Sequence, residues 1–283
     1  MMIKEALHQA SKTLASGGVE DTHLEAELLL MHVLGIDRTR LYLRLEEELS
    51  PHDAEALGQL LERRLRHEPI AYILGHREFF GHDFYVAPGV LIPRAESELL
   101  VEKALALVKS ESTRHDPVIA DIGTGCGAVA VSLALLLSQA RIYATDISRR
   151  ALDIAEVNRD RHGVQDRIHL LQGDLLDPLP EPVDIIIANL PYVRDEELGQ
   201  LSAEIRMFEP LSALAGGEDG LDKVRQLLSK TGEKLRPNGF IILEIGVGQG
   251  EVATSVAKSL FPRAVVELAR DLSGIDRVIS IAT

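Results

Sequence analysis

The chain has 283 residues, a single cysteine and a formal net charge of −14. This length suggests about two domains of ~100–200 residues each. One cysteine excludes a disulfide framework and a metal site built on several thiolates. The acidic balance disfavours a partner bound chiefly through its phosphates, because such binding depends on Lys and Arg. We therefore expect no nucleic-acid partner.

The chain also shows no sign of a membrane partner. Its first residues are amphipathic rather than typical of a signal sequence, and no apolar run approaches the ~20 residues of a membrane span. We expect a cytoplasmic protein.

Residues 1–67 have the pattern of helices. Apolar residues recur there every three or four positions, which is typical of helices with one buried face. Thr22 and Glu25 have the spacing of a capping box, and Ser50 with Pro51 is a typical helix start. The pattern predicts a small helical bundle whose apolar stripes form its core.

Residues 70–92 change character. Apolar and polar residues alternate around Gly81, which indicates a β-hairpin and a linker between domains. His76 and His82 lie in this segment, but two histidines without a third ligand do not make a metal site, and we expect no metal. Residues 93–98 carry a proline, an arginine and two acids, which is good capping chemistry for the helix that follows.

From residue 117 onward, strand and helix patterns alternate. This alternation predicts an α/β fold with a mainly parallel, doubly wound sheet. Seven strands are expected, at residues 118–122, 141–146, 168–171, 183–188, 240–245, 264–268 and 277–281.

A glycine-rich loop follows the first of these strands. Such a loop lets the backbone approach a ligand closely and aims helix N–H groups at it. Asp146 ends the next strand about 20 residues later, where an acid accepts hydrogen bonds from ribose hydroxyls. The spacing is Gly-x-Gly-x-Gly, whereas dinucleotide sites prefer Gly-x-Gly-x-x-Gly, which favours S-adenosylmethionine over NAD. The cofactor-binding residues predicted here are Gly123, Thr124, Gly125, Cys126, Gly127 and Asp146.

Two further residues fall near this site. Asp174 follows the third strand, where a carboxylate could accept from an adenine amino group, and Leu175 could pack on the ring. The alternative is a solvated loop acid. Cys126 is not expected to act as a nucleophile, because no histidine is positioned by sequence to activate it. A second glycine loop at residues 244–250 is interpreted as the turn after the fifth strand.

The fourth strand, at 183–188, is apolar throughout and ends at Asn189-Leu190-Pro191-Tyr192. Ligands of open α/β sheets bind beyond the carboxyl ends of the strands. Asn189 offers an amide oxygen, and Pro191 restricts the backbone of Leu190, which fixes the direction of the Leu190 carbonyl. Two acceptors and the aromatic face of Tyr192 could hold a planar amino or amide group. The alternative is an ordinary turn after a strand.

With these motifs, the chain resembles the bacterial release factor glutamine methyltransferases along nearly its whole length. Residues 121–127 are similar to that family's cofactor loop, Asp146 to its ribose acid, and residues 189–192 to its Asn-Pro-Pro-Tyr catalytic motif. More specific matches lie at residues 92–98, 209–221 and 271–277.

The resemblance implies a seven-stranded, Rossmann-like class I methyltransferase sheet preceded by a helical bundle. It implies methyl transfer from S-adenosylmethionine to the side-chain amide nitrogen of the glutamine in the Gly-Gly-Gln motif of class 1 peptide-chain release factors. Asn189 would also contact the cofactor. We expect a monomer with a substrate-recognition domain at 1–70, a hairpin linker at 71–92 and a methyltransferase domain at 93–283.

Two departures from the family pattern keep alternatives open. Ala95 replaces a proline, and Leu190 replaces the first proline of the catalytic motif, although leucine supplies the same backbone carbonyl. Asn-Leu-Pro-Tyr also occurs in the ribosomal RNA adenine dimethyltransferases. An RNA adenine methyltransferase and a non-catalytic cofactor-binding protein are therefore the alternatives.

Overall fold

The computed structural model describes residues 1–110 and 115–283. The chain divides into two compact units. The helical unit contains residues 1–75 and 202–208, and the sheet unit contains residues 76–201 and 209–283.

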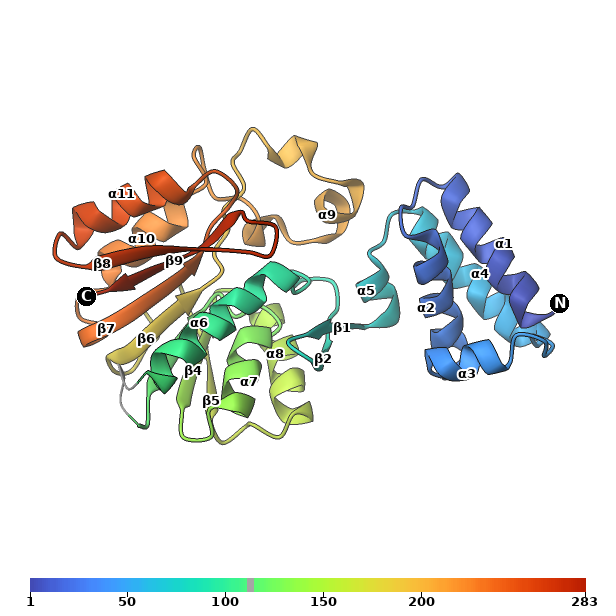
Figure 1. Cartoon of the computed structure of the whole chain (residues 1–283), viewed down its shortest axis with the longest axis horizontal. Helices are drawn as coiled ribbons and strands as arrows, with labels where there is room; N and C mark the ends of the chain where they lie inside the picture. Colours follow the sequence, from blue (N-terminus) through green and yellow to red (C-terminus); the bar gives the residue numbers. More distant parts are fainter. Residues whose placement is uncertain (111–114) are drawn as a thin grey trace. The chain divides into compact units, whose positions relative to one another are not determined.

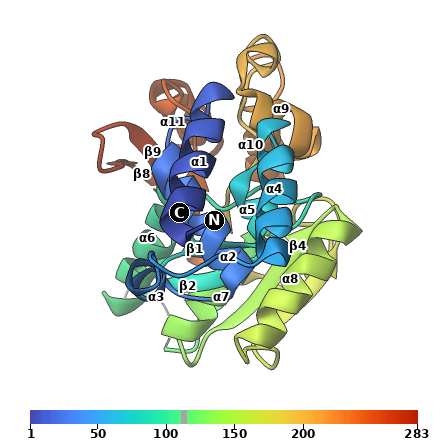
Figure 2. The same ribbon diagram turned by 90° about the vertical axis from the view of Figure 1, so that its right-hand side faces the viewer.

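The helical unit is a bundle in which α1, α2 and α4 pack on one another (Figure 2). Its core holds the apolar residues that recur at helical spacing, such as Leu14, Leu29 and Leu57. This confirms the helices predicted for residues 1–67. The helices are α1 (Ile3–Ser16), α2 (Thr22–Leu34), α3 (Arg38–Leu43), α4 (Pro51–Leu65), α5 (Ile70–Leu74) and α9 (Ala203–Phe208).

Two predicted caps in this unit have different outcomes. Ser50 caps α4, since its hydroxyl accepts from the backbone N–H of Asp53 at 3.1 Å. The capping box at Thr22 is wrong: the cap position of α2 is Asp21, with no side-chain cap bond. Glu25 instead accepts two bonds from the buried guanidinium of Arg64, at 2.5 and 3.1 Å.

Within residues 115–283, seven strands form one sheet in the order β5-β4-β3-β6-β7-β9-β8 (Figure 1). The pairs among β5, β4, β3, β6 and β7 are parallel, whereas β9 pairs antiparallel with both β7 and β8. The predicted mainly parallel sheet is confirmed. The strands are β3 (Val118–Ile122), β4 (Arg141–Asp146), β5 (Ile168–Gln172), β6 (Val183–Ala188), β7 (Leu235–Glu244), β8 (Val265–Arg270) and β9 (Asp276–Ala282).

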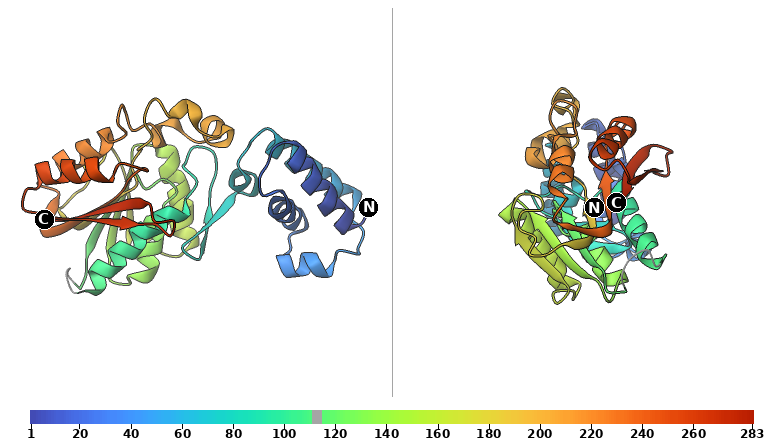
Figure 3. Two further views of the ribbon diagram at one scale, coloured as in Figure 1. Left: turned by 45° about the horizontal axis from the view of Figure 1, so that its top comes forward. Right: turned by 90° about the vertical axis from the view of Figure 1, so that its left-hand side faces the viewer.

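Helices cover both faces of the sheet, as Figures 1 and 3 show. Neighbours α6 and α7, then α7 and α8, pack together on one face, and α10 packs beside α11 on the other. Strands β3 and β6 are buried at every position, which explains why they lack an alternating pattern. The helices are α6 (Glu98–Lys109), α7 (Ala128–Leu136), α8 (Arg149–Arg161), α10 (Asp222–Lys230) and α11 (Gly250–Leu260).

The predicted hairpin consists of β1 (His76–Phe79) and β2 (His82–Tyr85), which pair antiparallel. Short 3-10 helices η1 (Ala95–Ser97), η2 (Leu198–Gln200) and η3 (Leu211–Ala213) lie in the connections of the sheet unit. In the part of the chain that the structure describes, no helix combines the length and apolar character that crossing a bilayer would require.

Candidate active site

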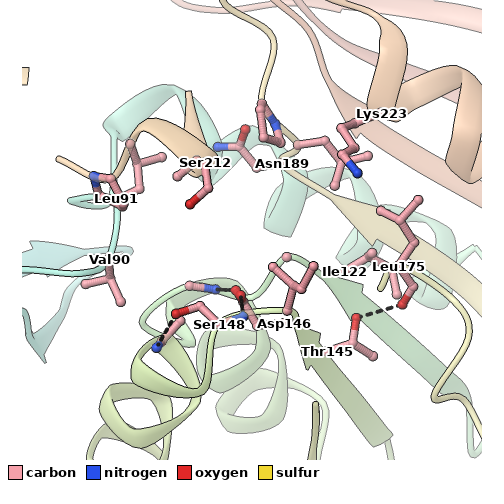
Figure 4. A pocket seen from close by; sticks show the side chains of 18 of the residues that line it. Val90, Leu91, Ile122, Thr145, Asp146, Ser148, Leu175, Asn189, Ser212 and Lys223 are labelled. Atoms are coloured by element: carbon pink, nitrogen blue, oxygen red, sulfur yellow. Dashed lines mark hydrogen bonds between the residues drawn. The ribbon is translucent and has the colours of Figure 1, made fainter. Parts of the chain in front are cut away.

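A cavity of about 340 Å³ lies beyond the carboxyl ends of β3, β4 and β6. Its walls combine apolar side chains, among them Ile122 and Val90, with a few polar groups (Figure 4). In the close view, Asp146 and Ser148 lie on one side of the cavity and Asn189 and Ser212 on the opposite side. A mostly apolar cavity with few polar groups, at the ends of parallel strands, is typical of a ligand site.

The glycine loop forms the floor of this cavity. Gly123 and Gly125 line it with φ of +72° and +57°, a backbone conformation that glycine adopts without strain. A Cβ at Gly127 would stand 3.2 Å from the Cβ of Ala155 in α8. Glycine at that position therefore allows the loop and α8 to pack closely.

Asp146 ends β4 and joins the glycine loop to the next helix. One carboxylate oxygen accepts from the N–H of Gly125 at 2.9 Å, and the other from the N–H of Ser148 at 2.8 Å. Burial raises the pKa of Asp146, whereas these backbone donors oppose the shift. Each oxygen keeps lone-pair capacity for a hydroxyl donor, because a carboxylate oxygen accepts more than one bond.

Asp174 and Leu175 line the same cavity after β5. The Asp174 carboxylate accepts from the side-chain amide of Gln226 at 2.8 Å and lies within ion-pair distance of Lys223 and Lys230. Leu175 has a positive φ of +50°, and its carbonyl accepts from Thr145 Oγ1 at 3.0 Å. Asp174 is thus held in place by side chains of α10 rather than free in solvent.

Three of the predicted cofactor residues, Thr124, Cys126 and Gly127, lie outside the cavity lining in the described chain. Thr124 Oγ1 donates to Asp121 at 2.6 Å, and the Cys126 carbonyl accepts from Asn158 at 2.8 Å. Burial raises the pKa of Cys126 to about 12, so its thiol stays protonated. These contacts hold the loop in shape.

Asn189, Leu190 and Pro191 line the cavity at the end of β6. Asn189 Nδ2 donates to Ser97 Oγ at 3.0 Å, so the amide is anchored through its nitrogen. The Leu190 side chain reaches the glycine loop, since a Cβ built on Gly123 would lie 3.6 Å from it. The first three residues of the tetrapeptide therefore share one cavity with the glycine loop and Asp146.

Tyr192, the fourth residue, lines a neighbouring cavity of about 300 Å³ together with Gln200 and Val247. Its hydroxyl donates to Glu244 at 3.2 Å. Burial, reinforced by the Glu244 charge, raises the pKa of Tyr192, so the phenol stays neutral.

Sequence reasoning missed three residues that hold this site together: Ser97, Glu244 and Gln249. Ser97 and Glu244 bond to each other and to the tetrapeptide. Gln249 bonds to the Tyr192 carbonyl. One signal was available, because Glu244 places a charge at the end of an apolar strand and just before a glycine loop.

The two acids predicted to favour the helix start lie there: Glu96 is in the short helix η1, and Glu98 is in the first turn of α6. Ser97 occupies the cap position of α6, but its hydroxyl makes no cap bond and donates to Glu244 at 2.5 Å. Glu98 accepts from the N–H of Phe80 at 2.8 Å.

Two chain segments that form a wall of the cavity are tied together. Residues 89–91 and 210–215 contribute to the lining. The residues next to these segments make the link: the buried carboxylate of Glu209 accepts from the N–H of Ile92 and from the guanidinium of Arg94. This pair links the sequence before α6 to the sequence before α10.

Comparison with known proteins decides the family. The chain is 44% identical to the release factor glutamine methyltransferase of Moorella thermoacetica, over 98% of this chain and 97% of the relative. It is 39% identical to that of Geobacter sulfurreducens, over 98% of this chain and 95% of the relative. This chain belongs to the release factor glutamine methyltransferase family.

Two family models match separate parts of this family member. Residues 5–75 match the PrmC N-terminal domain, and residues 97–210 match the methyltransferase small domain. The resemblance drawn from the motifs is confirmed. The ribosomal RNA alternative, which rested on the tetrapeptide alone, is not favoured by relatives that match along the whole chain.

Solved structures support the methyltransferase fold. The match to a methyltransferase from Pyrococcus furiosus covers 80% of this chain and 98% of the Pyrococcus chain, with a TM-score of 0.52 and 18% sequence identity. The N-terminal domain of human METTL16, solved in complex with SAH, covers 72% of this chain and 76% of its own, with a TM-score of 0.53 and 16% identity. The predicted Rossmann-like class I methyltransferase sheet is confirmed.

Proposed function

We propose that this protein methylates the side-chain amide nitrogen of the glutamine in the Gly-Gly-Gln motif of class 1 release factors, with S-adenosylmethionine as methyl donor. The observation that carries the proposal is the anchoring of Asn189 through its nitrogen, at the wall of the cavity that Asp146 and Gly125 also line. The names of the full-length relatives support the choice of substrate.

The residues of the cavity fit S-adenosylmethionine. Asp146 offers two carboxylate oxygens for ribose hydroxyls, and the glycine loop leaves open space, since nothing lies within 4 Å of a Cβ built on Gly125. Ile122 and Leu175 provide apolar surface for the base, and Asp174 provides an acceptor for its amino group. When bound, S-adenosylmethionine supplies an electrophilic methyl group on a sulfonium sulfur.

The tetrapeptide then has to orient a poor nucleophile, because the lone pair of an amide nitrogen is delocalised. Asn189 Oδ1 and the Leu190 carbonyl each accept one N–H of the glutamine amide, which turns the nitrogen toward the methyl group. The bound cofactor would supply the methyl group for the new N–C bond, and its sulfur would keep the electron pair of the broken C–S bond as the leaving group. Both acceptors stabilise the positive charge that develops on nitrogen, and the surplus proton leaves to water.

Tyr192 contributes an aromatic wall to the neighbouring cavity, and it is not a base. Its hydroxyl is committed to Glu244, and its raised pKa keeps the phenol neutral. We assign residues 1–70 to recognition of the release factor, residues 71–92 to a hairpin linker and residues 93–283 to methyl transfer. The match of residues 5–75 to the PrmC N-terminal domain supports the first assignment. The protein acts as a monomer in the cytoplasm, where its substrates work.

The test is an assay of purified protein with radiolabelled S-adenosylmethionine. Three acceptors are offered separately: a class 1 release factor, the same factor with the motif glutamine replaced by alanine, and ribosomal RNA. We expect label only on the first, and peptide mapping should place it on the motif glutamine. Label on RNA alone, or equal label on both release factors, would refute the proposal.

The role of the tetrapeptide is tested by Asn189→Ala. Turnover should fall by about 10²-fold or more, because the substrate amide loses an orienting acceptor. Calorimetric titration should give cofactor affinity close to that of the wild type. A variant that keeps substantial turnover would remove Asn189 from the mechanism.

A further inference from the structure

Three side chains from separate elements meet behind Asn189. Glu244 ends β7, Ser97 precedes α6, and Tyr192 closes the tetrapeptide after β6. Strands β6 and β7 are parallel neighbours in which Ala188 pairs with Leu243, so Asn189 and Glu244 follow at the same level of the sheet. Glu244 is 1% exposed and Ser97 is 5% exposed.

The bonds in this cluster have a definite direction. The Glu244 carboxylate accepts from Ser97 Oγ at 2.5 Å and from the Tyr192 hydroxyl at 3.2 Å. A serine hydroxyl has one proton, and here that proton is committed to Glu244. Toward Asn189, therefore, Ser97 presents only lone pairs.

This direction fixes the amide of Asn189. Ser97 Oγ lies 3.0 Å from Asn189 Nδ2, a contact that is favourable only when the nitrogen faces the hydroxyl. In the flipped orientation of the amide, Asn189 Oδ1 would face the lone pairs of Ser97 Oγ, and two acceptors would meet without a proton between them. The side-chain oxygen is consequently the end of Asn189 left to accept from another group.

The ionised form of Glu244 is needed for this arrangement. Burial raises the pKa of Glu244, while the bonds from Ser97 and Tyr192 and the charge of Arg277 oppose that shift. A neutral carboxylic acid would donate to Ser97 and free the serine proton for Asn189, which would favour the opposite amide orientation.

Ser97 also gives up a usual role. Serine at a helix cap position normally accepts a bond from a backbone N–H of the first turn. Ser97 occupies the cap position of α6 and makes no such bond. A capping function therefore does not account for this hydroxyl, whereas its contacts to Glu244 and Asn189 do.

We propose that Glu244 and Ser97 are positioning residues that set the orientation of the Asn189 amide, so that its oxygen is presented to the substrate. The inference rests on the proposed function, because it assigns the Asn189 oxygen to the glutamine amide. Neither residue touches the reacting atoms. Their effect is to hold an acceptor at a fixed angle, which is the kind of pre-organisation on which orientation-driven rate enhancement depends.

The experiment compares Ser97→Ala with Ser97→Thr, which keeps the hydroxyl. For Ser97→Ala we expect kcat to fall by about 10²-fold, with KM and cofactor affinity within about twofold of wild type. Ser97→Thr should restore most of kcat. Ser132→Ala is the matched control, because Ser132 is a fully buried serine whose hydroxyl has no hydrogen-bond partner among the described residues. It should leave kcat unchanged.

A second readout does not depend on turnover. In protein labelled with ¹⁵N-asparagine, the side-chain NH₂ signal of Asn189 is assigned by its loss in Asn189→Asp. Its protons should exchange with water faster in Ser97→Ala than in wild type or Ser97→Thr. Wild-type kcat or unchanged exchange in Ser97→Ala would overturn the positioning role. If wild-type protein transfers no methyl group to a release factor, the proposed function fails, while the exchange comparison still decides the inference.

Discussion

Gln249 donates its side-chain amide to the backbone carbonyl of Tyr192 at 3.0 Å. The same Nε2 donates to the carbonyl of Asp219 at 3.1 Å, and Oε1 accepts from the N–H of Gly246 at 2.7 Å. Gln249 is 3% exposed. One buried side chain thus joins the end of the tetrapeptide, the loop before α10 and the turn after β7.

Replacing Gln249 with methionine keeps its length and removes all three bonds. Each buried backbone group left unpaired costs about 1–3 kcal/mol, so we expect a large fall in the free energy of unfolding. Urea denaturation measures it. The control is Gln165→Met at an exposed position. Equal stability of the two variants would show that the bonds of Gln249 do not support the fold.

Gly216→Ala should lower turnover by moving the tetrapeptide. A Cβ at Gly216 would stand 2.7 Å from the Pro191 carbonyl and 2.8 Å from the Tyr192 Cα, so backbone must shift. Displacements of about 1 Å at a catalytic group cost about 10²-fold in rate. Steady-state kinetics should show this loss in kcat. Gly199→Ala, which would place a Cβ in open space, should keep wild-type kcat; equal kinetics in the two variants would contradict the expectation.

Asp146→Ala should weaken cofactor binding. The substitution frees the N–H groups of Gly125 and Ser148 that shape the loop. If Asp146 binds the ribose as proposed, the substitution also leaves the ribose hydroxyls without their acceptor. Hydrogen bonds to a charged group contribute about 1.5–3 kcal/mol, so we expect an affinity loss of about 10- to 100-fold. Calorimetric titration with S-adenosylmethionine measures it. Asp153→Ala, at a surface ion pair of α8, is the control; unchanged affinity in Asp146→Ala would refute the assignment.

Cys126 should be unreactive in the folded protein. It is 3% exposed, and burial raises the pKa of its thiol from 9.0 to about 12, which lowers the thiolate fraction about 10³-fold. Only the thiolate is nucleophilic. Iodoacetamide at pH 8 should therefore label the protein far more slowly in buffer than in urea, as followed by mass spectrometry. Rapid labelling of folded protein would reopen a chemical role for this cysteine.

The sequence patterns predict the sheet better than they predict the bonds around the site. Strands β3 and β6 are recognisable because a fully buried strand is apolar at every position. The glycine loop and the acid at the end of β4 are also recognisable, because each is defined by a short local stretch of sequence. In contrast, Ser97 and Glu244 are 147 residues apart, and Asn189 and Ser97 are 92 apart. A local pattern in the sequence cannot reveal a hydrogen bond between residues so far apart in the chain.

The same limit of local sequence patterns explains why the capping box predicted at Thr22 is wrong. Glu25 has the spacing of a capping-box acid relative to Thr22, and local sequence offers no competitor. In the folded chain the competitor is Arg64, 39 residues later, whose buried guanidinium binds both carboxylate oxygens of Glu25. A buried charge needs a charged partner more than a helix needs a cap bond, so the tertiary contact prevails.

The buried carboxyl of Asp121 should make stability depend on pH. Burial raises its pKa from 3.8 to about 6, although Thr124 and the N–H of Ala130 donate to it. Between about pH 4 and 6 the folded state therefore holds a proton that the unfolded state has lost. The free energy of unfolding should fall as pH rises through this window and level off above it, by up to about 3 kcal/mol.

Urea denaturation from pH 4 to 7 tests this expectation by comparison with Asp121→Asn. The variant has no titrating group at this position, so the decline between pH 4 and 6 should be smaller than in wild type. Asp166→Asn removes an exposed acid and should keep the wild-type slope, because no buried carboxyl is lost. Other buried acids with raised pKa, such as Glu244, contribute equally to wild type and variant and cancel in the difference. Parallel pH profiles for wild type and Asp121→Asn would show that Asp121 is already ionised below pH 4 in the folded protein.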